Sequence, residues 1–228
     1  MARGIALRRS LLWPIDDVLR GGTSAIARES SLNVWRMGGI LLACGSFHGA
    51  ILGSFIGHGS PRLAQIIYSA AKIPLLLLVT SALTLPSFFV VNNLLGLRAD
   101  FIASLRALAA SQAALTITLA SLAPVTLLWY LSDPDYSDAI LFNAGSFVIA
   151  TAAAQFALRR EYRPLIQQNA RHRLMLRVWL AVYAFVGIQM GWVLRPFIGD
   201  PDMPVSFFRP NAFTNAYLFL MHLILGKL

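Results

Sequence analysis

The sequence has few charged residues and almost no cysteine. Asp, Glu, Lys and Arg make up 13% of its 228 residues, whereas 57% of the residues are hydrophobic. An ordinary soluble domain carries about 25% charged residues. The single cysteine, Cys44, lies within an apolar tract, so no internal disulfide can form. These scarcities favour a membrane protein over a soluble domain.

Sequence motifs of catalysis and of metal binding are absent as well. The chain has no G-x-S-x-G, no H-E-x-x-H and no G-x-G-x-x-G, and no apolar tract holds a pair of carboxylates. Acidic residues in two polar segments are typical of solvated turns: Asp133, Asp135, Asp138, Asp200 and Asp202. We therefore predict no enzyme activity, no catalytic residue and no metal site.

Apolar tracts long enough to cross a membrane recur along the chain. A transmembrane helix needs about 20 predominantly apolar residues. We predict an all-α polytopic membrane bundle of about six helices, with spans near residues 37–57, 73–95, 107–131, 139–158, 174–194 and 212–228. The last tract is short, and we expect it to cross the membrane rather than to re-enter on the same side.

Residues 1–36 form a separate, basic segment ahead of the bundle. Apolar residues between Leu11 and Leu19 fall on one helical face, and Gly21 and Gly22 would end such a helix. We predict an amphipathic helix on the cytoplasmic surface of the membrane. A solvated helix docked on the bundle is the alternative.

The basic residues predict the orientation, because cytoplasmic segments carry an excess of Lys and Arg. With six spans and a cytoplasmic N-terminus, fifteen of the nineteen basic residues lie inside: six in residues 1–36, Arg98 and Arg106, six in residues 159–177, and Lys227. The other four lie outside: Arg62, Lys72, Arg195 and Arg209. We therefore place the N-terminus inside. Arginines at the ends of apolar tracts also favour anionic lipids over nucleic acid as partners.

Glycines recur at every fourth residue in the first apolar tract. On a helix they would form one flat ridge against which another helix can pack closely. A shorter G-x-x-x-G pair occurs in the fifth tract. The predicted packing residues are Gly45, Gly49, Gly53, Gly57, Gly187 and Gly191.

His48 and His222 are the histidines within apolar tracts, each near the middle of its tract. Two imidazoles at matched depth could ligate a haem, or one could ligate a chlorophyll. Hydrogen bonding between helices explains a buried histidine without any cofactor. We expect no cofactor and keep haem or chlorophyll ligation as an alternative.

Uncharged amide side chains within the tracts suggest a path for a small solute. They are Asn92, Asn93, Gln112, Asn143, Gln155 and Gln189. Pro86 and Pro124 could break helices as in transporters. However, no carboxylate, Lys or Arg lies deep in a tract, although ion-coupled pumps usually need such a group. Amides that join helices by hydrogen bonds are the simpler interpretation.

The most distinctive stretch surrounds W-V-L-R-P-F-I-G at residues 192–199. Its tryptophan and arginine suit a helix end at the membrane surface, and the proline ends the helix. A helix-end anchor is therefore one interpretation. The other is a loop that docks a partner outside the membrane through Trp192, Arg195, Pro196, Phe197, Phe207 and Phe208.

Three stretches carry a resemblance: W-V-L-R-P-F-I-G, Y-S-A-A-K-I-P-L-L at 68–76 and L-A-P-V-T at 122–126. Through them most of the chain beyond residue 36 resembles a group of bacterial polytopic inner-membrane proteins without an assigned activity. Its arrangement of spans is also similar to that of Yip1-type multispan proteins. The resemblance implies a fold and a location in the bacterial inner membrane, but no catalytic residues.

These observations predict a non-catalytic integral membrane scaffold, or an accessory subunit of a larger membrane protein assembly. Its expected partners are other integral membrane proteins, copies of itself, and anionic lipids at the basic cytoplasmic face. A small-solute transporter or channel is the first alternative. A subunit that ligates haem or chlorophyll through His48 and His222 is the second.

Overall fold

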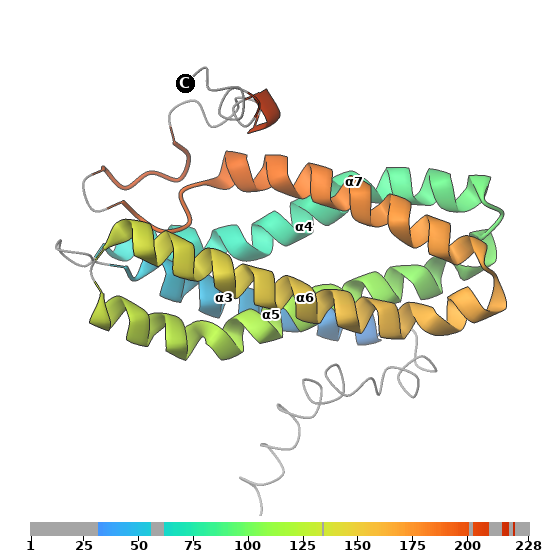
Figure 1. Ribbon diagram of the computed structural model, residues 1–228, viewed down its shortest axis with the longest axis horizontal. Helices are drawn as coiled ribbons and strands as arrows, with labels where there is room; N and C mark the ends of the chain where they lie inside the picture. The colour runs from blue at the N-terminus through green and yellow to red at the C-terminus, as the bar shows by residue number, and fades with distance from the viewer. Residues whose placement is uncertain are drawn as a thin grey trace, which may run out of the picture.

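The computed structural model describes residues 32–55, 62–133, 135–200, 203–209, 216–218 and 221, and all regular structure within them is helical. In chain order the elements are α3 (Leu32–Gly53), α4 (Leu63–Leu94), the short 3-10 helix η1 (Arg98–Asp100), α5 (Phe101–Ser132), α6 (Tyr136–Gln168) and α7 (Arg171–Leu194). Successive long helices run in opposite directions along one bundle (Figure 1). The predicted all-α fold is confirmed. The proposed amphipathic helix lies outside the described residues, apart from residues 32–36, which belong to α3.

Helix α3 lies between α4 and α5. It packs along both α4 and α5, and α4 and α5 have little contact with each other. Helix α6 packs mainly on α5, and α7 mainly on α4. Gly49 and Gly53 of α3 lie directly against the backbone of α4, because a helix without side chains on one face can be approached closely.

Four helical segments are long and apolar enough to cross a membrane: Leu63–Leu94, Arg98–Ser132, Tyr136–Gln168 and Arg171–Leu194. Large apolar side chains on their outer surfaces are exposed, for example Phe156 at 71% and Val148 at 69%. Exposed apolar surface of this extent is typical of contact with lipid. The predicted transmembrane helices are confirmed at this level. Helix α3 is not among the four, because its glycines, Arg36 and His48 reduce its apolar content.

Each of the five long helices begins before the apolar tract from which its span was predicted, whereas the span ends themselves stay predictions. Helix α4 begins at Leu63 rather than near residue 73, so Pro74 lies inside the helix instead of at its start. Lys72, which was predicted in an outer loop, is a wholly buried residue of α4. Apolar content marks only the part of a helix that contacts lipid or core. Residues 63–72, which include three alanines, Leu63 and Gln65, favour helix and continue α4 toward its start.

The predicted basic loop at residues 159–173 is also wrong. Helix α6 continues to Gln168 and α7 begins at Arg171, so only two residues separate the two helices. The arginines of this region lie on helix ends that extend past the apolar part. A helix of 33 residues is about 50 Å long, whereas the hydrocarbon core is about 30 Å thick.

The alternating helix directions give the bundle two different ends. The end that we call the basic end holds the start of α3, the α4–α5 corner and the α6–α7 corner. The opposite end, the capped end, holds the end of α3, the start of α4, the α5–α6 turn and residues 195–209, which we call the capping loop (Figure 1). Within the capping loop, residues 201 and 202 are outside the described residues.

Candidate functional site at the capped end

The capping loop begins where α7 stops. Residues before proline are excluded from the helical region, and Arg195 is accordingly extended, with Leu194 as the last helical residue. The loop then passes over the ends of α3 and α4. Gly199 lies so close to Gln65 that a Cβ atom at this position would approach the Gln65 Cγ atom to 2.7 Å. Glycine is thus the residue that allows the loop to lie directly on the bundle.

Side chains from the start of α4 hold the loop by its main chain. Lys72 Nζ donates a hydrogen bond of 2.6 Å to the carbonyl of Pro196, and Ser69 Oγ donates one of 2.6 Å to the carbonyl of Phe197. Arg62 Nη1 donates to the carbonyl oxygens of Asp200 and Met203 at 2.8 and 2.7 Å. Charge-assisted hydrogen bonds are stronger than neutral ones. The loop is therefore fixed to α4 at several points.

Aromatic contacts add to this attachment. The ring of Phe207 packs edge-to-face on Tyr68, with 5.4 Å between the centroids, and Lys72 Nζ lies 5.1 Å from the Phe207 ring centre. Two of the stretches that carry the resemblance, 68–76 and 192–199, thus meet through Ser69, Lys72 and the carbonyls of the capping loop.

The four basic residues that were predicted outside all lie at this end. None of them is exposed, and two face the space beneath the loop. The Arg195 guanidinium stacks on the Trp192 ring at 3.3 Å from its centre. Arg209 Nη2 donates a hydrogen bond of 3.3 Å to the Tyr136 hydroxyl. Burial, and secondarily the positive charge of Arg209, lower the pKa of Arg195 from its ordinary value.

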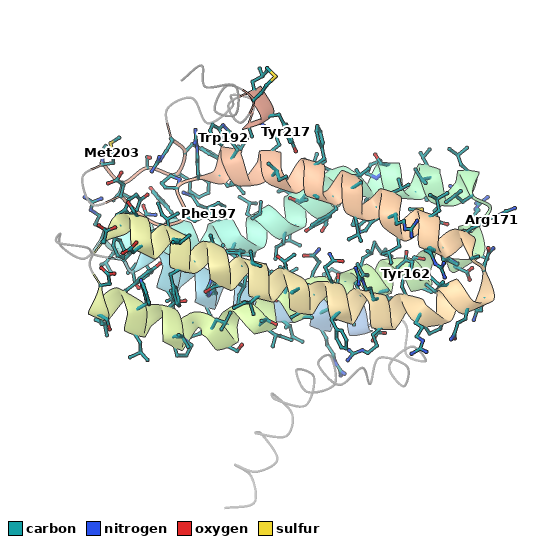
Figure 2. All side chains as sticks on the ribbon, in the orientation of Figure 1. Tyr162, Arg171, Trp192, Phe197, Met203 and Tyr217 are labelled. Carbon is teal, nitrogen blue, oxygen red and sulfur yellow. The ribbon has the colours of Figure 1, made fainter. Side chains whose placement is uncertain are left out.

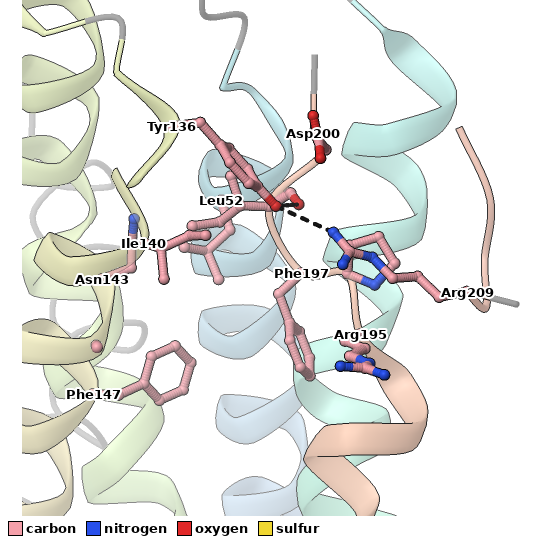
Figure 3. Close-up of a pocket in the computed structure, with 12 residues that line it drawn as sticks. Leu52, Tyr136, Ile140, Asn143, Phe147, Arg195, Phe197, Asp200 and Arg209 are labelled. Atoms are coloured by element: carbon pink, nitrogen blue, oxygen red, sulfur yellow. Dashed lines mark hydrogen bonds between the residues drawn. The ribbon is translucent and has the colours of Figure 1, made fainter. Parts of the chain in front are cut away.

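A pocket of about 380 Å³ lies between the capping loop and α6 (Figure 3). Its α6 wall contains Tyr136, Ile140, Asn143 and Phe147, and the opposite wall contains the two arginines and Phe197, as Figure 3 shows. The full lining is Leu52, Tyr136, Ile140, Asn143, Ala144, Phe147, Arg195, Pro196, Phe197, Ile198, Asp200 and Arg209. A concave, mostly apolar space with a few converging polar groups is the usual form of a ligand site.

Asp135 and Tyr130 shape the α6 wall. The Asp135 carboxylate accepts hydrogen bonds from the backbone N–H groups of Ser137 and Asp138, which caps the start of α6. Further along, Asn143 Nδ2 donates to the Tyr130 hydroxyl of α5 at 2.7 Å and to the Ala139 carbonyl at 2.7 Å. These bonds fix the first turns of α6 against α5, beside the pocket.

The predicted packing glycines occupy unlike environments. A Cβ atom at Gly49 would collide with the Ser69 carbonyl oxygen and lie 2.9 Å from the Ala70 Cα atom, and one at Gly53 would lie 2.6 Å from the Gln65 carbonyl oxygen. Gly45 is in ordinary contact with Ile73, at 3.5 Å. A Cβ at Gly187 would meet only Thr80, at 3.7 Å, and one at Gly191 would meet nothing within 4 Å. Gly57 lies outside the described residues.

Of the two histidines considered as haem or chlorophyll ligands, only His48 lies within the described part of the chain. His48 is completely buried, with its ring edge on Phe147 and against the backbone of Leu119. Its ring nitrogens have no partner among the described residues that meets hydrogen-bond geometry. His222 lies outside the described residues, so the ligand pair predicted for haem stays a prediction.

The amide side chains do not line one path. Asn143 lies in the capped-end pocket, whereas Gln112 lines a separate cavity of about 170 Å³ among α3, α4, α5 and α7. The two cavities share no lining residue. Asn92 is buried near the end of α4, and Gln189 Oε1 accepts a hydrogen bond from the Ala216 backbone N–H at 3.0 Å.

The predicted docking residues divide into buried and exposed members. Trp192 supports Arg195, Pro196 and Phe197 line the pocket, and Phe207 packs on α4. Phe208 is 41% exposed, and Met203, which sequence reasoning did not select, is 56% exposed. Figure 2 shows Met203 at the outer edge of the capped end and Phe197 beneath it.

Sequence reasoning missed Ser69, Lys72 and Tyr136 as parts of this site. One sequence signal could have found this site. The segments predicted outside hold only four basic residues, and all four lie at the capped end. Comparisons with protein-family models, with characterised proteins and with solved structures find no match to this chain. The description of the site therefore depends on its geometry alone.

Proposed function

We propose that the protein is a non-catalytic integral membrane scaffold or accessory subunit, with six spans and the basic end in the cytoplasm of a bacterial cell. The exposed arginines at the basic end support this orientation. Helix α3 would be the first span, packed between α4 and α5 and with Leu42 and Phe47 exposed on its outer side. Residues 212–228 would supply the last span.

The attachment of the capping loop is the observation that carries the proposal. A loop held by Arg62, Ser69 and Lys72 keeps its shape without a partner, so binding need not order it. The loop presents Met203 and Phe208 as exposed apolar side chains. Methionine and aromatic residues are enriched in protein interfaces. A preformed surface with such residues suits docking of another membrane protein.

Site-specific photocrosslinking in cells tests this proposal. A photoreactive phenylalanine analogue replaces Met203 or Phe208 in the full chain, and the matched control carries it at Phe156, which is 71% exposed on the outer surface of α6. We expect discrete protein adducts from positions 203 and 208, and no adduct of the same mass from position 156. The absence of adducts at both loop positions, or the same adducts at all three positions, would contradict the proposal.

A small-solute transporter is the second candidate, favoured by the inner cavity. Gln112 of α5 and Ser81 of α4 line it, and the Tyr183 hydroxyl of α7 lies close to both. Three helices thus place polar groups together inside the bundle. Uptake of labelled solutes into vesicles, with Gln112→Leu as the test variant, distinguishes the candidates, because a scaffold needs no such uptake.

A further inference from the structure

The capped-end pocket has an apolar wall on α6 and two arginines on the facing wall. The residues that α6 contributes recur every three or four positions, so they lie on one helical face. Tyr136 lies at the start of that face, next to Arg209, and Phe147 lies eleven residues further on, about 16 Å along the helix. Ile140 and Ala144 lie between them. Across the pocket, Arg195 lies at about the level of Phe147 (Figure 3). The pocket therefore has a mainly apolar wall on α6, and its two arginines lie on the opposite wall.

The two arginines have unused hydrogen-bonding capacity. A guanidinium carries five N–H donors. Among the described residues Arg195 donates no hydrogen bond and its Nε is buried without a partner, while Arg209 has its bond to Tyr136. Asp200 is the carboxylate in the lining, so two positive charges face one negative charge. The Trp192 ring and the Tyr136 hydroxyl offset part of the cost of withdrawing these half-buried charges from water. An anion between the guanidinium groups would offset more of that cost.

The pocket opens to the side of the bundle. Helices α6 and α7 meet at their shared corner and diverge toward the capped end (Figure 1), and they have few contacts with each other. Ile140 is 45% exposed and Ala144 is also exposed at the edge of the pocket. In a spanning bundle this opening faces lipid chains rather than water.

We propose that this pocket binds one amphiphile, with an anionic phosphate or carboxylate headgroup between Arg195 and Arg209 and an apolar chain along α6 toward Phe147. Planar guanidinium groups suit the bidentate geometry of both kinds of anion. The inference goes beyond the scaffold function, which requires no bound lipid. It also concerns the capped end and not the basic face, where we expect anionic lipids to bind by general attraction.

Photolabelling of the full chain in nanodiscs tests the proposal. The discs consist of phosphatidylcholine with a few per cent of a phosphatidylglycerol or phosphatidylcholine that carries a diazirine on its acyl chain. Mass spectrometry compares the label on residues 140–147 with the label on Phe89 and Val90, which are exposed on α4. We expect the anionic probe to label residues 140–147 preferentially. Arg195→Gln and Arg209→Gln should each reduce this preference about fivefold.

Two further variants separate the pocket from general effects. Arg173→Gln removes the same charge from an exposed site at the basic end and should leave the preference unchanged. Ala144→Trp fills the apolar half while leaving every bond of the capping loop in place, and should remove the preference even if an arginine variant folds poorly. Equal labelling by the two probes, an equal loss in Arg173→Gln, or unchanged labelling in Ala144→Trp would overturn the proposal. Complete competition by inorganic phosphate would show a site for small anions only and would overturn it as well.

Discussion

The two ends of the bundle use basic side chains in opposite ways. At the basic end Arg36, Arg98, Arg163, Arg171 and Arg173 are exposed. At the capped end none of the basic residues is exposed, and Lys72 is wholly buried with its ammonium group on a backbone carbonyl. Exposed charges interact weakly with the rest of the fold, so those of the basic end can signal orientation. At the capped end the buried Lys72 and the half-buried Arg62 instead hold the capping loop by its carbonyl groups.

The same contrast runs along α3. Near the basic end, Gly38 and Gly39 have no atom within 4 Å of a potential Cβ. Near the capped end, Gly49 and Gly53 leave no room for a Cβ against the backbone of α4. The capped end is therefore the closely packed end of this helix. Sequence spacing alone does not distinguish the two pairs of glycines.

The largest expected effect comes from filling that close contact. Gly49→Ala and Gly53→Ala should each lower the free energy of unfolding by about 1–3 kcal/mol, because the added methyl group forces α3 and α4 apart. Thermal unfolding in detergent measures the change.

Gly39→Ala is the matched control for the glycine variants. It should be neutral or stabilise α3 by up to about 1 kcal/mol, since alanine favours helix and nothing obstructs the methyl group. If Gly39→Ala and Gly49→Ala behave alike, the two halves of α3 do not differ in packing as described.

A second substitution compares the two kinds of basic residue. Lys72→Met keeps most of the side-chain volume but leaves the Pro196 carbonyl without its donor, at a cost of about 1–3 kcal/mol. Arg173→Met, at the exposed position, should change stability by no more than about 0.5 kcal/mol. Protease cleavage within the capping loop should also become faster in Lys72→Met alone. Equal stability of the two variants would show that burial of Lys72 does not anchor the loop.

A partly buried polar contact at the basic end should have a smaller effect. His172 Nε2 lies 3.1 Å from Asp100 Oδ2, and this contact joins α7 to η1. A double-mutant cycle with His172→Ala and Asp100→Ala should give a coupling of about 0.5–1.5 kcal/mol. The adjacent pair Arg160 and Glu161, at 3.6 Å and partly exposed, is the control and should give less than about 1 kcal/mol. A larger coupling in the control pair would reverse the expected order.

The sequence was sufficient for the fold class, because long apolar tracts between clusters of charge have few other interpretations. Alternating helices also follow from those tracts. The helix ends could not be predicted from the apolar tracts alone. Helix α6 continues through charged residues that favour helix, and α4 begins ten residues before its predicted span, in a stretch where Gln65, Ser69 and Lys72 interrupt the apolar residues. Lys72 was placed in a loop for this reason.

The candidate site was predictable only in part. The stretch around Arg195 and Pro196 was recognisable as distinctive, but the direction in which the capping loop folds depends on tertiary contacts. Phe207 shows the difference, because a loop phenylalanine has no sequence signal for packing on Tyr68 instead of facing a partner. The convergence of Arg195 and Arg209 on one pocket likewise depends on residues far apart in the chain.

The central proposal is that the two ends lie on opposite sides of a membrane, with the basic end inside. Cysteine labelling in intact bacterial cells tests it most directly. In a Cys44→Ala background, Ser137→Cys places a thiol at the capped end and Gln168→Cys places one at the basic end, and both positions are exposed. We predict that a membrane-impermeant maleimide labels position 137 in intact cells and position 168 only after lysis. Labelling of position 168 in intact cells, with or without position 137, would contradict the account.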